Sequence, residues 1–135
     1  MPNLIYAARM TERWSVEPVL GVPDVLSAVD FFCDKLGFTR PETLYGPPAQ
    51  PAYAVVRRAG VAVHLQVRRR PLFSGAREGH EGDGYFMVEN VDALRAELLA
   101  KGVKLHRDVQ DEPYGLRDFT IETPEGLRLS FASPL

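Results

Sequence analysis

The sequence has a single cysteine, little net charge and no long apolar run, and each of these absences excludes a class of protein. Cys33 alone cannot form an internal disulfide, so we expect a cytoplasmic protein that needs no oxidising compartment. The formal net charge of -2 differs from the basic footprint of a nucleic-acid-binding protein. No apolar run reaches the roughly 20 residues of a membrane-spanning helix. We therefore expect neither nucleic acid nor a membrane as a partner.

What the sequence does contain is typical of one globular domain. Its 135 residues are 45% hydrophobic and 25% charged, which is an ordinary balance for a chain with a buried core. We expect residues 1–135 to form a single domain.

Residues 16–38 give the clearest local pattern, a strand followed by a tight turn and a helix. Asp24 is a suitable N-cap, because its carboxylate can accept the first free backbone N–H groups of a helix. Gly37 is a suitable helix stop, because glycine enters the left-handed conformation without a Cβ clash. The apolar positions with strand spacing are Leu20 and Val22, and those with helical spacing are Val25, Val29, Phe32 and Leu36.

The same pattern recurs later in the chain. A strand at 85–88 precedes Asn90, a second candidate N-cap that stands 66 residues after Asp24, and a helix that ends at Gly102. Further strands are expected near 43–45 and at 53–57, 61–67, 104–109, 117–122 and 127–131. The fold class is therefore α+β, with two βαβββ modules at about 15–68 and 83–132, joined by a loop at 69–82.

One such module covers only one face of its sheet with a helix, so two modules can curl around a cleft walled by the uncovered faces. Because side chains alternate along a strand, the cleft side of each strand can be predicted. We expect the cleft side to carry Glu17, Val19, Gly21, Ala62, His64, Gln66, Asp83, Tyr85, Met87, Arg128 and Ser130.

These modules resemble the vicinal oxygen chelate superfamily, which contains glyoxalase I, extradiol dioxygenases, fosfomycin-resistance enzymes and bleomycin-resistance proteins. The likeness covers about residues 16–132. It is carried by Pro18-Val19-Leu20, Asp24-Val25 and Asp34-Lys35-Leu36-Gly37-Phe38, by residues 88–103, and by Pro124-Glu125-Gly126.

Within this superfamily the chain is most similar to the bleomycin-resistance proteins, because Pro113-Tyr114-Gly115 resembles their Pro-Trp-Gly turn. The resemblance implies an antibiotic-sequestering protein without ordinary enzymatic activity. It also implies a homodimer, either side by side or domain-swapped, whose protomers together build the cleft.

The metalloenzymes of the superfamily place one ligand at each of four cleft positions, which here hold Glu17, His64, Asp83 and Ser130. Serine replaces the usual glutamate, and the short Asp83 replaces the usual histidine. We therefore expect no metal cofactor. The alternative is a divalent metal ion held by Glu17, His64 and Asp83, in a divergent glyoxalase- or dioxygenase-like enzyme.

Without a metal, the cleft offers aromatic faces and a few polar groups, which suit a planar ligand. The weak net charge favours an uncharged or anionic planar molecule at least as much as cationic bleomycin. We expect a metal-independent binding protein that sequesters a planar, antibiotic-like molecule. Its predicted ligand-binding residues are His64, Gln66, Tyr85, Met87, Tyr114 and Ser130.

Overall fold

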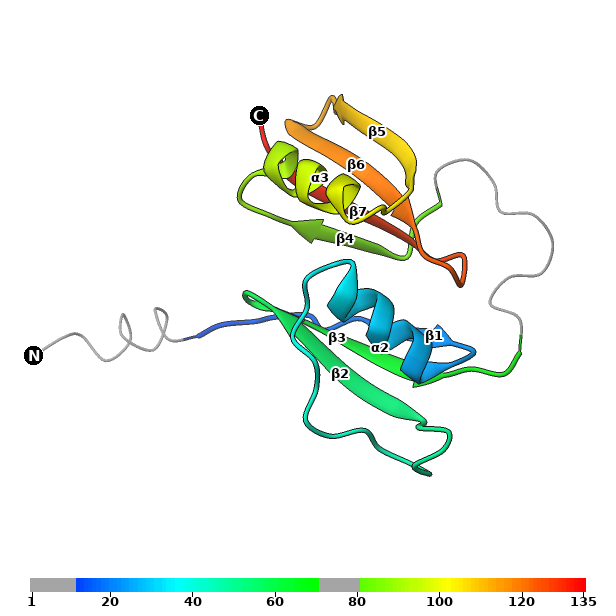
Figure 1. The fold of residues 1–135 in the computed structure, drawn as a ribbon. Coiled ribbons are helices and arrows are strands. Elements are labelled where there is room, and N and C mark those ends of the chain that lie inside the picture. The colour runs from blue at the N-terminus through cyan, green and yellow to red at the C-terminus, as the bar shows by residue number, and fades with distance from the viewer. Residues whose placement is uncertain (1–11, 71–80) are drawn as a thin grey trace, which may run out of the picture.

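The computed structural model describes residues 12–70 and 81–135 and confirms an α+β fold of two modules (Figure 1). Most of the predicted 69–82 loop, residues 71–80, lies outside the described residues. The first module consists of β1 (Val19–Val22), α2 (Val25–Asp34), β2 (Tyr53–Arg58) and β3 (Val61–Val67). The second consists of β4 (Gly84–Met87), α3 (Val91–Ala100), β5 (Leu105–Asp111), β6 (Leu116–Glu122) and β7 (Arg128–Pro134).

Both helices begin and end where the sequence predicts. The Asp24 carboxylate accepts hydrogen bonds from the backbone N–H groups of Leu26 and Ser27. Asn90 caps α3 in the same way, through the N–H of Ala93. Gly37 and Gly102 follow the two helices with φ of 74° and 79°, the left-handed region in which a Cβ is unfavourable.

Each module builds a small mixed sheet. The strand order is β1-β3-β2 in the first sheet and β4-β7-β6-β5 in the second. In each sheet the first strand pairs in parallel with the last strand of its module, and the remaining pairs are antiparallel. The two-residue turn at Ala59-Gly60 fixes the β2–β3 register, so that Val55 lies opposite His64.

The fourth strand expected in the first module, near 43–45, does not form. Only two isolated bridges occur in that region, Thr39 with Arg57 and Tyr45 with Tyr53. Pro47, Pro48 and Pro51 explain this difference, since proline has no backbone N–H for a strand ladder and restricts the residue before it.

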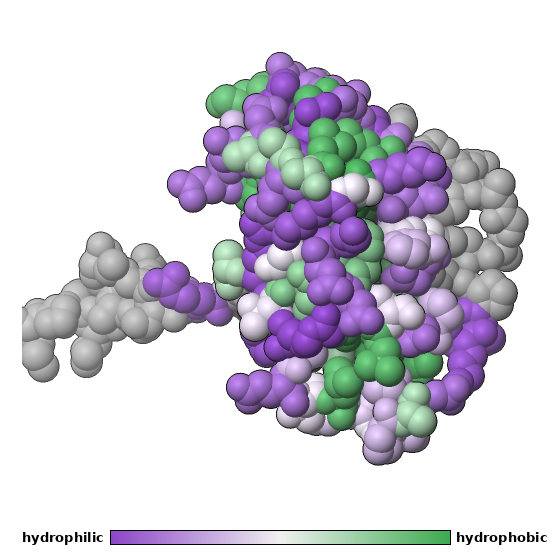
Figure 2. Space-filling view, in the orientation of Figure 1, coloured by the Kyte–Doolittle hydropathy of each residue, from purple (hydrophilic) through white to green (hydrophobic). Residues whose placement is uncertain are grey.

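Each helix packs on a face of its own sheet, and Figure 1 shows both helices on the same side of the molecule. Their buried residues belong to one core that runs through both modules, from Phe32 and Leu65 to Leu98 and Phe119. Figure 2 shows that hydrophilic side chains cover much of this helix side, while hydrophobic ones gather in a few separate patches. Among the described residues, no helix is long and apolar enough to cross a membrane.

Candidate functional site

The sheet faces that carry no helix hold most of the predicted ligand-binding residues. We call the face of β1, β3 and β2 that includes Val19, His64 and Gln66 the first open face. The face of β4, β7, β6 and β5 that includes Tyr85, Ser130 and Thr120 is the second open face. The register confirms this grouping, because Val19 pairs with His64 and Tyr85 pairs with Ser130, which in turn pairs with Thr120.

Asp118 is the centre of a hydrogen-bond network on the second open face. Its side chain is fully buried, yet it accepts bonds at both carboxylate oxygens. The Tyr85 hydroxyl donates to Oδ2 at 2.8 Å, and the Tyr114 hydroxyl lies 3.4 Å from the same atom. Arg107 Nη2 donates to Oδ1 at 3.1 Å. A buried carboxylate is tolerated when charged and polar donors replace its water in this way.

Glu112 extends this network to the rim of the face. Its carboxylate accepts bonds from Arg107 and Tyr114 through Oε2 and from Gln110 through Oε1. The bonds from Gln110, and then those from Tyr114 and Arg107, hold the pKa of Glu112 below its usual range. This network therefore combines two carboxylates with one guanidinium.

The two tyrosines of this network present their rings to solvent. Tyr85 is 46% exposed and Tyr114 is 62% exposed, although both hydroxyls are bonded. Burial, and then hydrogen bonds with Tyr114 and Asp118, raise the pKa of Tyr85 far above its ordinary value, so its phenol stays neutral. Rings that are fixed at the hydroxyl end and open along their faces are suited to stacking on a planar molecule.

Met87 and Ser130 share the second open face with Tyr85, because Met87 follows it by two residues on β4 and Ser130 pairs with it on β7. Met87 is 52% exposed and pairs with Ala132 of the neighbouring strand β7. The Ser130 hydroxyl lies 2.7 Å from that of Thr120, a pair in which either group can donate. The structure thus brings together Tyr85, Met87, Tyr114 and Ser130, four of the six predicted ligand-binding residues.

The remaining two, His64 and Gln66, lie on the first open face. His64 Nε2 is 2.7 Å from Glu17 Oε1, and its Nδ1 is 2.6 Å from the Tyr53 hydroxyl. A carboxylate only accepts, so a neutral His64 ring carries its proton on Nε2 and accepts from Tyr53 at Nδ1. Gln66 is exposed and pairs with Tyr53 across the hairpin.

The structure does not assemble the alternative metal set. Glu17 and His64 meet on the first open face, but Asp83 belongs to the other module and accepts a bond from the backbone N–H of Arg128. Within residues 12–70 and 81–135, no three His, Cys, Asp or Glu side chains form a group that could hold a metal ion.

The sequence analysis did not predict the three charged members of the network on the second open face, which are Arg107, Glu112 and Asp118. A signal was present for Asp118. The turn at 123–126 sets the register of β6 and β7, which places Asp118 opposite Ala132 and on the same face as Ser130. Arg107 could not be placed in this way, because β5 shifts register twice against β6.

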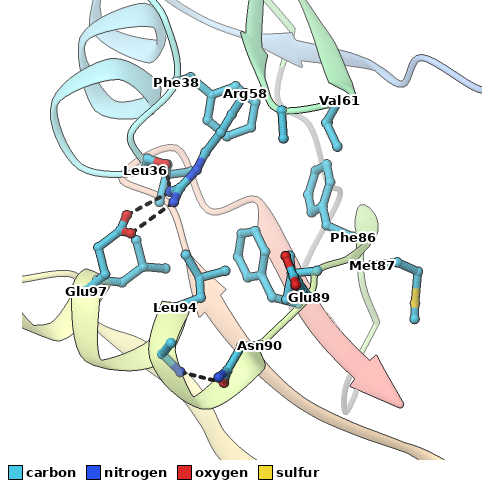
Figure 3. A pocket seen from close by; sticks show the side chains of 15 residues that line it. Leu36, Phe38, Arg58, Val61, Phe86, Met87, Glu89, Asn90, Leu94 and Glu97 are labelled. Carbon is cyan, nitrogen blue, oxygen red and sulfur yellow. Dashed lines mark hydrogen bonds and ion pairs between the residues drawn. The ribbon is translucent and has the colours of Figure 1, made fainter.

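A pocket of about 390 Å³ lies elsewhere, between the two modules on the helix side (Figure 3). Of the six predicted residues only Met87 contributes to its wall. The open faces and this inter-module pocket are therefore different features of the molecule.

Comparison with known proteins gives a consistent picture. The family model described as the Glyoxalase/Bleomycin resistance protein/Dioxygenase superfamily matches residues 15–131. A bleomycin resistance protein of Geobacillus stearothermophilus is 28% identical over 128 residues, which cover 84% of this chain and 92% of that protein.

Two solved structures share the fold at lower identity. The bleomycin-binding protein of Streptomyces verticillus, solved in complex with copper(II)-bleomycin, is 24% identical with a TM-score of 0.69, covering 93% of this chain and 100% of that one. A glyoxalase-related enzyme from Clostridium phytofermentans is 21% identical with a TM-score of 0.71, covering 94% and 99%. The same architecture thus occurs in a binding protein and in an enzyme, so the site decides between these functions.

Proposed function

This chain belongs to the glyoxalase/bleomycin resistance protein/dioxygenase superfamily, and we propose that it binds and sequesters a planar small molecule, as a bleomycin resistance protein does. The observation that carries the proposal is the pair of exposed tyrosine rings whose hydroxyls are tied to carboxylates beneath them. Such rings are preorganised, so binding costs little side-chain entropy.

The charges of the Asp118–Glu112–Arg107 network favour a neutral or cationic ligand over an anionic one. Asp118 and Glu112 together exceed the single charge of Arg107. The ring faces of Tyr85 and Tyr114 also attract positive charge. This differs from the composition argument, which favoured an uncharged or anionic ligand at least as much as a cationic one.

We propose that the ligand is held in a homodimer in the cytoplasm, where an open face of each protomer helps to wall a cleft. The support is the exposure of apolar side chains on both open faces. Val19 is 53% exposed on the first face, and Tyr85 and Met87 are about half exposed on the second. Exposed apolar side chains that gather on one face of a protein mark interaction sites.

Titration calorimetry with metal-free bleomycin tests the binding function. We expect Tyr85→Ala and Tyr114→Ala each to weaken binding about fivefold, because each removes a stacking surface worth roughly 1 kcal/mol. Tyr85→Phe keeps the ring and should retain most of the affinity. Tyr45→Ala is the matched control, since Tyr45 is 56% exposed but lies on the loop beside β2.

Two outcomes would contradict the proposal. One is equal affinity of Tyr85→Ala and Tyr45→Ala. The other is no heat with bleomycin, together with no small molecule retained by protein purified from cells. Light scattering on the same samples should give twice the 15.1 kDa chain mass for the proposed homodimer.

Metal independence is tested by repeating the titration after dialysis against EDTA, where we expect unchanged affinity. The alternative enzyme would require a divalent ion at Glu17 and His64, with Asp83 supplied from the second module. A stoichiometric nickel, zinc, manganese or ferrous ion that His64→Ala abolishes would favour that enzyme and overturn the sequestration proposal.

A further inference from the structure

The inter-module pocket is a hollow that neither the fold nor the open faces explain. Its volume of about 390 Å³ falls within the range of small-molecule sites. The pocket is partly open to solvent, so a small molecule can enter it from outside. Its lining is mainly apolar and offers few hydrogen-bond partners.

The walls are mainly apolar and come from both modules. Phe38 and Val61 belong to the first module, and Phe86 and Leu94 belong to the second; Figure 3 shows their side chains converging. Phe86 also stacks on Phe131, with ring centroids 5.2 Å apart, so the floor of the pocket is rigid. A molecule in this space would contact both modules at once.

The charged side chains of Arg58 and Glu97, at the edge of the pocket, already bind each other. Arg58 Nη1 and Nη2 donate to the two oxygens of Glu97 at 2.7 and 2.9 Å, and Nη1 also donates to the Leu36 carbonyl. A ligand therefore needs no charge to match Arg58. Glu89 also lines the pocket, and within the described part of the chain its carboxylate forms no hydrogen bond or ion pair.

Two small residues lie at or beside the edge of the pocket, Gly37 next to Arg58 and Ala59 in the pocket lining. A Cβ at Gly37 would lie 2.8 Å from Arg58 Nη1, so a larger residue would displace the ion pair. Ala59 lines the pocket at a φ of 51°, a turn position that asparagine, aspartate or glycine usually occupies. Alanine there projects only a methyl group, whereas asparagine or aspartate would bring a polar side chain.

We propose that the inter-module pocket is a second binding site, for an uncharged and mainly apolar small molecule with at most one hydrogen-bond donor directed at Glu89. The volume suits a molecule of two or three fused or linked rings and is too small for a helix of a partner protein. Binding there is separate from binding on the open faces and links the two modules.

Fluorescence of the neutral dye N-phenyl-1-naphthylamine, which rises in apolar surroundings, tests this site. We expect one dye per chain in the wild-type protein. Ala93→Trp should weaken dye binding at least tenfold, because Ala93 is an exposed residue of α3 that lines the pocket. Ala96→Trp is the matched control, since Ala96 is exposed on the same helix but does not line the pocket.

Val61→Phe supplies a second blocking variant from the first module and should also weaken dye binding. Tyr85→Ala should leave dye affinity within about twofold, so loss of the open-face function cannot be mistaken for loss of this site. The proposal is overturned if wild type binds no dye, or if folded Ala93→Trp and Val61→Phe both bind it as the Ala96→Trp control does. If Ala93→Trp alone changed the oligomeric mass, the pocket would be an interface between chains. That result would also overturn the proposal.

Discussion

Asp118 shows how one residue can organise a binding surface. Its carboxylate is fully buried among Tyr85, Arg107 and Tyr114. These three side chains donate the hydrogen bonds that water would otherwise supply to the carboxylate. The hydroxyl of each tyrosine is directed inward and its ring outward. The carboxylate thus fixes two aromatic side chains that belong to different segments of the chain.

Asp118→Asn should lower the free energy of unfolding by about 2–3 kcal/mol, because it removes the fully buried member of the two carboxylate charges that pair with Arg107. Urea denaturation at neutral pH measures the change. Asp108→Asn is the control, since Asp108 pairs with Arg95 in an exposed ion pair and should change stability much less. Equal losses of stability in the two variants would show that the burial of Asp118 does not strengthen its contribution to stability.

The sequence predicts which face each side chain of this site takes, but not the partners it finds there. Tyr85 and Ser130 lie on the predicted face because strand alternation is a local rule. The bond from Tyr53 to His64 depends on hairpin register, which could have been read from the Ala59-Gly60 turn. The bond from Arg107 to Asp118 depends on register shifts in β5 that no local pattern announces.

At the scale of elements, the helices are the best-predicted part of the chain. Their caps act within three residues, so a local pattern is sufficient to place them. The prediction of a strand near 43–45 was wrong. Its residues have strand propensity, but the prolines that follow them prevent a continuous ladder of hydrogen bonds. Residue propensity favours a strand here, but the missing backbone N–H groups of the prolines prevent it.

Asp24→Ala should lower the free energy of unfolding by about 1 kcal/mol, because two N–H groups at the start of α2 lose their acceptor. Ser27→Ala, one turn along the same exposed surface, should be neutral or slightly stabilising, since alanine is the better helix former. Chemical denaturation of both variants checks the prediction. A loss of equal size in Ser27→Ala would mean that the cap contributes nothing specific.

At the scale of the whole molecule, the sequence predicts two modules but not how they meet. The repeated strand–helix pattern is visible because each copy is local. Beside the shared apolar core, two polar contacts link the copies: Arg58 with Glu97, and the Lys35 ammonium donating to the Lys101 carbonyl. They join positions far apart in the chain, and the inter-module pocket forms beside them. No periodicity in either module alone could reveal that pocket.

The Arg58–Glu97 pair makes the joining of the modules dependent on pH. Hydrogen bonds from Arg58 hold the pKa of Glu97 below its usual value. A depressed carboxyl pKa means that the stabilisation is present above the unfolded-state value of about 4.5 and is lost as pH falls through the lower folded-state value. Both side chains are about one-third exposed, with 36% of each accessible, so solvent screening keeps the contribution small.

Glu97→Gln should therefore lower the free energy of unfolding by about 0.5–1 kcal/mol at pH 7. Its difference from wild type should shrink as pH falls from 4.5 towards 3, where wild-type Glu97 also becomes neutral. Urea denaturation over this pH series, repeated in 0.5 M sodium chloride, measures the effect, and salt should reduce it. Glu42→Gln, an exposed loop position, is the control and should change stability little at any pH. A Glu97→Gln difference that stays constant from pH 7 to pH 3 would mean that the side chain contributes through packing, and that the charge pair does not join the modules.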